Sequence, residues 1–217
     1  MNYNEFTVIS NYFSPVLDQG PVLIKADTMA RIPSVQTERL CDLFFQGRDY
    51  VLETRNDIFR ARRGNIELFI LSVLFWGFPR NQKGRCTAAM NNWEALVEWT
   101  RSVRNHKEMT TDEFTNLFPI MDAIRGIGIS TFSKLLYFLG AYIDGFSCVI
   151  LDDMVARGVS NLEGQEFEQI RTAVLGRYRY YRYYTDYLTA IDNLSIDNHI
   201  PEGNVEYALW LAGKKNR

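Results

Sequence analysis

Apolar residues recur at the spacing of amphipathic helices from Gln36 onward. The strongest repeat, at i, i+3 and i+4, predicts a buried helix that contains Ile66, Phe69, Ile70, Val73 and Leu74. The segment Gly77-Phe78-Pro79 is expected to end it. A further helix contains Trp93, and the capping-box pair Thr110 and Glu113 opens another. The pattern therefore predicts a mainly all-α fold.

Residues 1–35 lack this periodicity. Two apolar segments, FTVIS and PVLIK, are separated by Pro15, Gly20 and Pro21, so we expect short strands or an extended arm there. The sequence is therefore divided into an irregular or short-strand N-terminal segment, residues 1–35, and a helical domain, residues 36–217.

The composition, 47% apolar and 23% charged, is typical of a globular protein in water. No stretch approaches the roughly 20 apolar residues that a membrane helix needs. The first residues include Glu5 and no basic region, unlike a secretory signal. We expect an intracellular, cytoplasmic protein that makes no contact with a membrane.

Cysteine and histidine are too sparse to indicate a metal site. Cys41, Cys86 and Cys148 lie far apart, no CxxC motif occurs, and the chain contains 2 histidines. We therefore expect no disulfide framework, no bound metal and no cofactor.

The formal net charge of −2 argues mildly against a nucleic-acid ligand. Net charge is a poor measure of the local field, however, and the basic residues are clustered. The clusters are Arg55, Arg60, Arg62 and Arg63; Arg80, Lys83 and Arg85; Arg101, Arg104 and Lys107; and Arg177, Arg179 and Arg182. Such patches are compatible with DNA binding, and Arg62, Arg63 and Arg80 are candidate phosphate contacts.

The stretch IRGIGIST predicts a tight turn between two helices. Its two glycines allow a sharp reversal and let a phosphate approach backbone N–H groups. The second helix, expected to start near Ser130, directs its positive dipole end to the same place. We assign DNA-backbone binding to Gly126, Ile127, Gly128, Ser130 and Thr131. The alternative is a helical hairpin with a glycine cap and no ligand.

The segment IRGIGISTFSKLLYFLG, followed by a loop and ILDDMVARGV, resembles the signature of the HhH-GPD superfamily of base-excision DNA glycosylases. The likeness covers about residues 119–159, with the helix-hairpin-helix at about 119–140. LSVLFWGFPR and VEYALW also look like bacterial relatives of 8-oxoguanine DNA glycosylase. The resemblance implies a two-lobed helix-hairpin-helix glycosylase fold with a cleft between the lobes.

By position, Asp152 matches the catalytic aspartate of that family, with Asp153 as the alternate. The family's lysine nucleophile falls on Ser130 here, which leaves a monofunctional enzyme that uses water or a relocated lysine. Lys134 lies one helical turn beyond Ser130, and its long side chain recovers much of that displacement. The competing interpretations are a surface lysine and a helix-capping aspartate.

A base flipped out of DNA needs aromatic walls, and we expect Phe75, Trp76 and Phe78 to form that pocket. The tract RYRYYRYYTDY, residues 177–187, is interpreted as a helix with tyrosines inward and arginines in solvent. The inward residues would be Tyr180, Tyr183, Tyr184 and Tyr187, with Arg179 and Arg182 outside. The alternative is that this tract contacts DNA.

These observations favour a monomeric, nucleoid-associated DNA glycosylase that acts on double-stranded DNA containing a damaged base. The favoured lesion is an oxidised purine such as 8-oxoguanine, with AP-lyase activity if Lys134 is the nucleophile. Two other hypotheses remain open. One is a non-catalytic helix-hairpin-helix module that only binds DNA, and the other is a helical scaffold that binds a protein partner.

Overall fold

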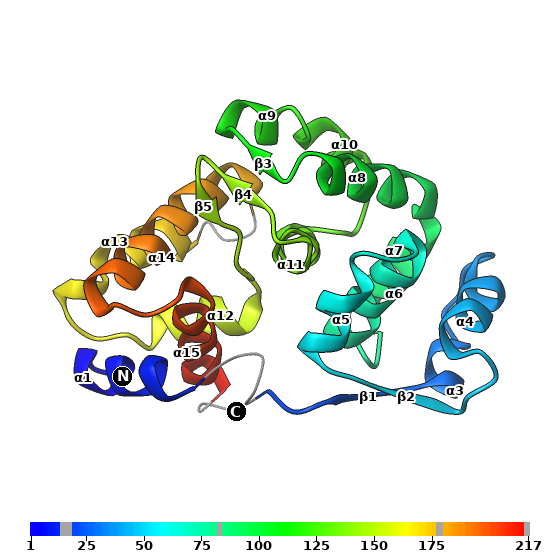
Figure 1. Cartoon of the computed structure of the whole chain (residues 1–217), viewed down its shortest axis with the longest axis horizontal. Coiled ribbons are helices and arrows are strands. Elements are labelled where there is room, and N and C mark those ends of the chain that lie inside the picture. Colours follow the sequence, from blue (N-terminus) through cyan, green and yellow to red (C-terminus); the bar gives the residue numbers. More distant parts are fainter. Residues whose placement is uncertain (14–18, 82–83, 177–179, 215–217) are drawn as a thin grey trace.

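The helices form two lobes in a computed structural model, and α11 (Ile129–Leu139) lies between them (Figure 1). The structure describes residues 1–13, 19–81, 84–176 and 180–214. Within these ranges, no helix is long and apolar enough to cross a membrane. The mainly helical fold expected from the sequence is confirmed.

The first lobe comprises β1 (Val22–Lys25), α3 (Ala26–Met29), α4 (Thr37–Phe45), β2 (Tyr50–Glu53), α5 (Arg55–Ala61), α6 (Ile66–Gly77), α7 (Arg85–Asn91), α8 (Trp93–Asn105), α9 (Thr111–Thr115), α10 (Phe118–Ala123) and α11. The second lobe comprises α1 (Tyr3–Tyr12), α12 (Asp153–Ser160), the 3-10 turn η2 (Gln165–Phe167), α13 (Glu168–Val174), the 3-10 turn η3 (Tyr181–Tyr183), α14 (Tyr184–Asn198) and α15 (Glu202–Lys214).

Within the described residues, the short strands form a two-stranded and a three-stranded sheet. In the first lobe β1 pairs antiparallel with β2, with Val22 opposite Glu53. Between the lobes, β4 (Tyr142–Ile143) pairs antiparallel with β5 (Phe146–Ser147) and parallel with β3 (Glu108–Met109). This small sheet connects the end of α11 to the segment that leads into α12.

The helix α6 is the centre of the first lobe. Its apolar side chains Phe69, Ile70, Val73 and Leu74 are fully buried, as the periodicity predicted. Asn65 caps its start by accepting hydrogen bonds from the N–H groups of Glu67 and Leu68, and it ends at Gly77 as expected. α11 packs against α6, α5 and α8, so this core fixes the position of α11.

The described residues of the N-terminal segment form the helix α1, the strand β1 and the short helix α3, rather than two strands or an arm. PVLIK supplies β1 as expected, but FTVIS lies inside α1. The reason is local: Asn2 and Glu5 form a reciprocal capping box that satisfies the first backbone donors of α1. Residues 1–35 therefore do not act as a unit, because α1 packs on α15 in the second lobe while β1 belongs to the first.

The helices α12 and α15 touch through their backbones at two glycines. A Cβ on Gly158 would overlap the carbonyl oxygen of Leu209, and a Cβ on Gly213 would overlap that of Met154. Because only glycine fits at both places, the two helices approach more closely than side chains permit. This contact fixes α12, and so the loop that precedes it, against α15.

We expect Gly158→Ala to destabilise the protein by about 2–3 kcal/mol, because the added methyl group collides with backbone that cannot move independently. Gly64→Ala is the matched control, since its Cβ would meet its nearest atom, Ala61 O, at an ordinary 3.6 Å. The measurement is the midpoint of urea unfolding for both variants. Equal midpoints would contradict the close packing of α12 on α15.

Candidate active site

The turn between α10 and α11 has the tight geometry expected of a hairpin. Gly126 has a φ of +82°, and a Cβ there would lie 2.8 Å from the Cβ of Ala88. Gly128 is different: its φ of −136° and ψ of −170° suit any residue, and no atom lies within 4 Å of its Cβ position. Neither backbone conformation nor packing within the protein requires glycine at this second position.

The helix α7 holds this turn in place. The Nη1 of Arg85 donates to the carbonyl oxygen of Gly126 at 2.7 Å, and the Nδ2 of Asn92 donates to that of Arg125 at 3.4 Å. Ile127 is buried, so it packs back between the helices as expected. The turn is therefore a fixed part of the first lobe.

The helix α11 begins at Ile129, one residue before the expected Ser130. The N–H groups of its first residues point out of the helix end without an acceptor inside the helix. The N–H of Thr131 already donates to Gly128 O at 2.9 Å, and its side chain is buried. Ile127 is in the same position, because its N–H donates to Ile124 O at 3.3 Å. Of the five residues assigned to DNA-backbone binding, Ile127 and Thr131 thus have neither a side chain nor an N–H available.

Lys134 reaches back along α11 to Ser130. Its Nζ donates to the carbonyl oxygen of Ser130 at 3.1 Å and to its Oγ at 3.2 Å. Side chains on a helix lean toward its N-terminus, so a lysine stem covers one turn in this direction. The amine of Lys134 therefore lies beside Ser130, and with 4% side-chain exposure it is no ordinary surface lysine.

The side chain of Asp152 contacts the amine of Lys134. Its Oδ2 accepts a hydrogen bond from Lys134 Nζ at 3.0 Å. Its Oδ1 caps α12 by accepting from the N–H groups of Met154 at 2.9 Å and Val155 at 3.1 Å. Asp153 is the first residue of α12. The Asp152 carboxylate thus caps α12 of the second lobe and pairs with Lys134 of the first lobe.

Three hydroxyl groups hold the segment that leads into Asp152. Tyr184 donates to Val149 O at 2.6 Å, and Tyr187 donates to Ile150 O at 2.8 Å. The Oγ of Ser133, on α11, accepts from Leu151 N at 3.0 Å. These bonds satisfy buried backbone groups and fix the path of the chain before Asp152.

The tyrosine tract is therefore only partly the inward stripe that its spacing predicted. Tyr184 and Tyr187 are fully buried, as expected. Tyr180 is 56% exposed, because η3 interrupts the expected helix and α14 starts only at Tyr184. The guanidinium of Arg182 lies over the ring of Tyr183 at 4.8 Å. Arg179 lies outside the described residues.

The pKa of Asp152 lies below its ordinary value. Burial alone would raise it, but the positive charge of Lys134 and the N–H donors of Val155 and Met154 act in the opposite direction and prevail. The carboxylate is therefore ionised at neutral pH. A permanent negative charge is thus held at the start of α12, where the helix dipole also favours it.

The C-terminal end of α6 lies under Lys134. The Nζ of Lys134 is 5.4 Å from the centre of the Phe78 ring, and a Cβ on Gly77 would lie 3.1 Å from the lysine Cδ. Phe78 is half-buried, whereas Trp76 is 6% exposed and Phe75 is fully buried between Phe44 and Phe45. Of the three expected pocket residues, only Phe78 offers an appreciable free surface beside Lys134.

A second buried ion pair joins the lobes, and no local sequence pattern predicts it. Arg55 of α5 donates from Nη1 to Glu206 Oε2 of α15 at 3.1 Å, with side-chain exposures of 1% and 0%. The same nitrogen donates to Tyr137 Oη at 3.0 Å. Arg55 was grouped with surface arginines by its sequence neighbours, but its burial removes it from any DNA-facing patch.

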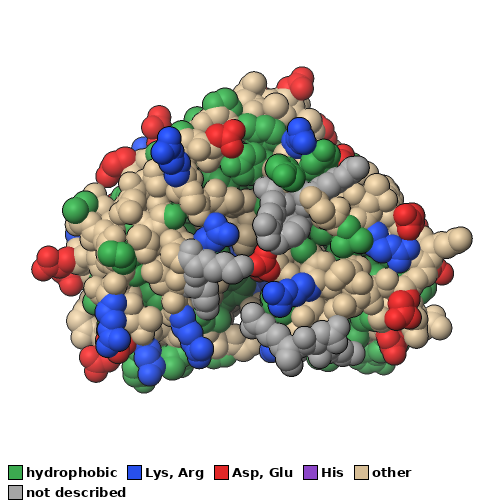
Figure 2. All heavy atoms as spheres, turned by 180° about the vertical axis from the view of Figure 1, so that it is seen from behind, with side chains coloured by type: hydrophobic (Ala, Val, Ile, Leu, Met, Phe, Trp, Pro, Cys, Tyr) green, Lys and Arg blue, Asp and Glu red, His purple; other side chains and the backbone are tan. Residues whose placement is uncertain are grey.

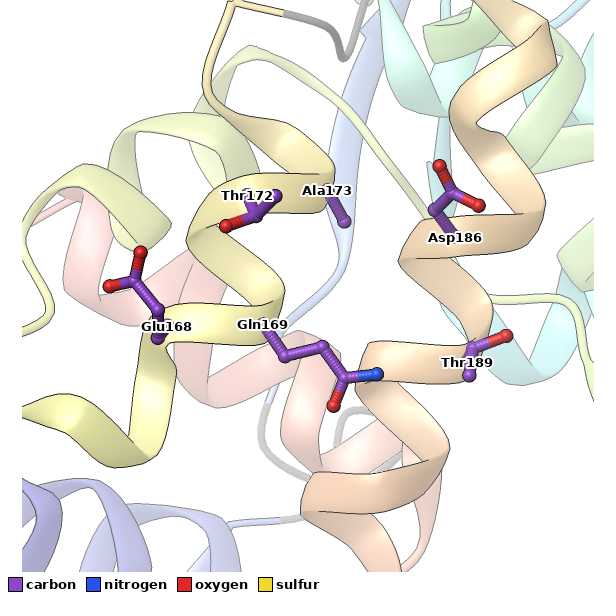
Figure 3. A pocket seen from close by; sticks show the side chains of 6 residues that line it. All are labelled: Glu168, Gln169, Thr172, Ala173, Asp186 and Thr189. Carbon is purple, nitrogen blue, oxygen red and sulfur yellow. The ribbon is translucent and has the colours of Figure 1, made fainter.

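Other hollows in the described structure lie away from this pair. Figure 3 shows one of about 510 Å³ between α13 and α14, lined by Glu168, Gln169, Thr172, Ala173, Asp186 and Thr189. Its two carboxylates would repel a phosphate backbone. A hollow of about 440 Å³ is lined by Phe59, Arg60, Arg62 and Arg63. Among the described residues, no three His, Cys, Asp or Glu side chains are grouped to hold a metal ion.

The chain is a glycosylase-like helical protein. Residues 23–210 match the family described as "Putative 8-oxoguanine DNA glycosylase OGG-like protein". Because this match covers most of the chain, the protein belongs to that family, and membership implies DNA binding. No curated protein and no solved structure matched the chain.

We expect the stability that Asp152 contributes to be lost in acid. Its pKa is lower in the folded protein than in the unfolded chain, so its contribution is present above pH ~4 and disappears as the pH falls through the folded pKa. The measurement is the free energy of unfolding of wild type minus that of Asp152→Asn, which should shrink between pH 7 and pH 3. Asp27→Asn, at a residue whose side chain is 65% exposed, is the control. A difference that is constant with pH would contradict the ion pair.

Proposed function

We propose that this protein is a base-excision DNA glycosylase that removes an oxidised purine such as 8-oxoguanine from double-stranded DNA. The observation that carries the proposal is the 3.0 Å contact between Lys134 Nζ and Asp152 Oδ2, one turn inside the helix that follows the glycine hairpin. The resemblance to the HhH-GPD superfamily and the matched family both support this function. The protein would act as a monomer on the DNA of the nucleoid.

The hairpin is proposed to grip the DNA backbone. At Gly128 a side chain would meet no protein atom, so the open space there suits the close approach of a phosphate. The N–H groups that start α11 and the dipole of this helix favour an anion at the same point. Gly126, Gly128 and Ser130 would contribute through their backbone N–H groups, with Arg85 nearby. The N–H of Ile127 is already bonded to Ile124 O, so Ile127 would only hold the turn by its packing.

The slightly acidic average of the chain does not exclude such a contact, because net charge is a poor measure of the local field. In Figure 2 several basic side chains lie well inside the outline of this face, whereas acidic side chains lie mostly toward its rim. Backbone contacts of this kind carry no sequence information, which suits an enzyme that must examine every base pair.

Asp152 is proposed to stabilise the transition state. As the base departs, positive charge develops on the deoxyribose, and a fixed carboxylate below the sugar lowers the energy of that state. The lowered pKa of Asp152 keeps this group ionised for the purpose. Its bonds to the start of α12 fix its direction before the substrate binds.

Lys134 is proposed as the nucleophile. Its Nζ first gives a proton to Asp152 Oδ2, 3.0 Å away. Asp152 passes that proton on to the departing base, so the carboxylate is an anion again when positive charge develops on the sugar. The amine then bonds to C1′ while the bond from C1′ to the base breaks, and the base takes up the proton that Asp152 received from the lysine. The alkylated amine gives a proton to O4′ as the sugar ring opens to a Schiff base. Loss of a C2′ proton to water then expels the 3′ phosphate and cleaves the strand. The flipped-out base would lie against Phe78.

We expect Asp152→Asn to lower the rate of base release by about 100-fold or more, because the developing charge loses its counterion. The measurement is single-turnover cleavage of duplexes that each contain one lesion, followed by alkali to reveal abasic sites. Asp153→Asn is the neighbouring control and should retain most activity. If the wild type releases no base from any lesion yet binds DNA with a salt-dependent affinity, the protein is instead a non-catalytic DNA-binding module.

Borohydride should trap a covalent complex between the wild type and a lesion duplex, because it reduces the Schiff base. This band should disappear in Lys134→Gln and persist in Lys107→Gln, where an exposed lysine is replaced. Gel electrophoresis after reduction provides the measurement. Base release without any trapped band would assign the reaction to water and remove Lys134 as nucleophile.

A further inference from the structure

Two ion pairs among the described residues join the lobes, and both have the same polarity. In each, the cation belongs to the first lobe and the carboxylate to the second: Lys134 pairs with Asp152, and Arg55 pairs with Glu206. In Figure 1, α5 and α15, which carry the second pair, face each other below α11. The catalytic function proposed above uses only the first pair.

Arg55 is bonded on every side. Its Nη2 lies 3.5 Å from Glu206 Oε1, so together with Nη1 it binds the carboxylate through two nitrogens. Its Nε donates to Gln19 Oε1 at 2.6 Å. The rings of Trp76, Tyr137 and Tyr207 surround its guanidinium at 5.4, 5.2 and 5.8 Å. A guanidinium held in this way has one position.

Burying such an ion pair adds little to the free energy of folding. Two charges lose their hydration, and well-packed apolar side chains of similar size are often at least as stabilising. Burial acts to lower the pKa of Arg55, but Glu206 and Tyr137 outweigh this effect and raise it, so the guanidinium is charged. What an ion pair adds is direction, since its hydrogen bonds fix the register of the two elements that carry it.

The elements joined in this way carry Lys134 and Asp152. Arg55 bonds Tyr137, which lies three residues after Lys134 on α11. Glu206 lies on α15, which touches α12 backbone to backbone at Gly158, and Asp152 caps α12. A continuous path of fixed contacts therefore sets the distance between the lysine amine and the carboxylate.

We propose that Arg55 and Glu206 are positioning residues. They hold Lys134 beside Asp152 even when Lys134 and Asp152 no longer attract each other. The proposal rests on the proposed function, because a second contact between the lobes is needed only when the reaction weakens the pair of Lys134 and Asp152. When Lys134 gives up its proton to attack C1′, the pair between Lys134 and Asp152 loses its attraction. Neither Arg55 nor Glu206 takes part in this proton transfer, so the hydrogen bonds between them maintain the register of the lobes through this step.

The test uses the double variant Arg55→Met/Glu206→Leu and the single variant Tyr137→Phe. The double variant replaces the pair with apolar side chains inside the aromatic cage and should fold. Tyr137→Phe keeps the ring and removes only the hydroxyl that links Arg55 to α11. Arg39→Met is the control, because Arg39 pairs with Glu67 inside the first lobe at 2.9 Å.

Two readouts are measured on the full-length proteins. Acetic anhydride labelling with mass spectrometry reports how accessible the Lys134 amine is without requiring activity. We expect labelling of Lys134 to accelerate roughly threefold or more in both test variants, as the lobes lose their register. Single-turnover base release should fall roughly 10- to 100-fold at unchanged DNA affinity, since small misplacements are costly to catalysis. Arg39→Met should match the wild type in both.

Wild-type labelling of Lys134 in Tyr137→Phe and in the folded double variant overturns the proposal, whatever the activity. Loss of DNA affinity in proportion to the loss of rate also overturns it, because a general structural defect would produce that result. If Lys134 is labelled faster in the test variants but the wild type releases no base, the positioning of Lys134 is supported and the glycosylase function is contradicted. The failure of either proposal is thus recognised separately.

Discussion

The contact between Lys134 and Asp152 joins two lobes that are built from distant parts of the chain. It needs the amine to fold back one turn along α11 and the carboxylate to project from the cap of α12. Both groups are largely removed from water, so each must find its hydrogen bonds within the protein. The hydroxyls of Tyr184, Tyr187 and Ser133 supply the backbone bonds that make this geometry the stable one.

The end of α6 serves both interlobe cations. The ring of Trp76 lies under Arg55, and that of Phe78 lies under Lys134, with Gly77 between them giving space to the lysine stem. Aromatic faces attract cations and exclude water from them. The buried core of the first lobe therefore ends in a surface that orients two charges toward the second lobe.

Local features of the sequence predicted the parts of the site that depend on local geometry. The hairpin glycines, the capping role of Asp152 and the reach of Lys134 to Ser130 all follow from spacing within a few residues. The partnership of Arg55 with Glu206 could not be found in this way, because 151 residues separate them. Phe75 and Trp76 were expected at a pocket, but only tertiary packing shows that they face the core and Arg55.

The placement of α1 in the second lobe has a consequence for how the protein is made. α1 is synthesised before every element of the first lobe, yet the helix it packs on, α15, follows all of them in the chain. The first lobe has all its elements once α11 has been synthesised, whereas the second lobe lacks a partner for α1 until α15 has followed. Because contacts between such distant segments form slowly, we expect the contact between Lys134 and Asp152 to reach its final geometry late in folding. Until α15 has docked, α12 lacks the backbone contact at Gly158 that fixes the position of the Asp152 carboxylate.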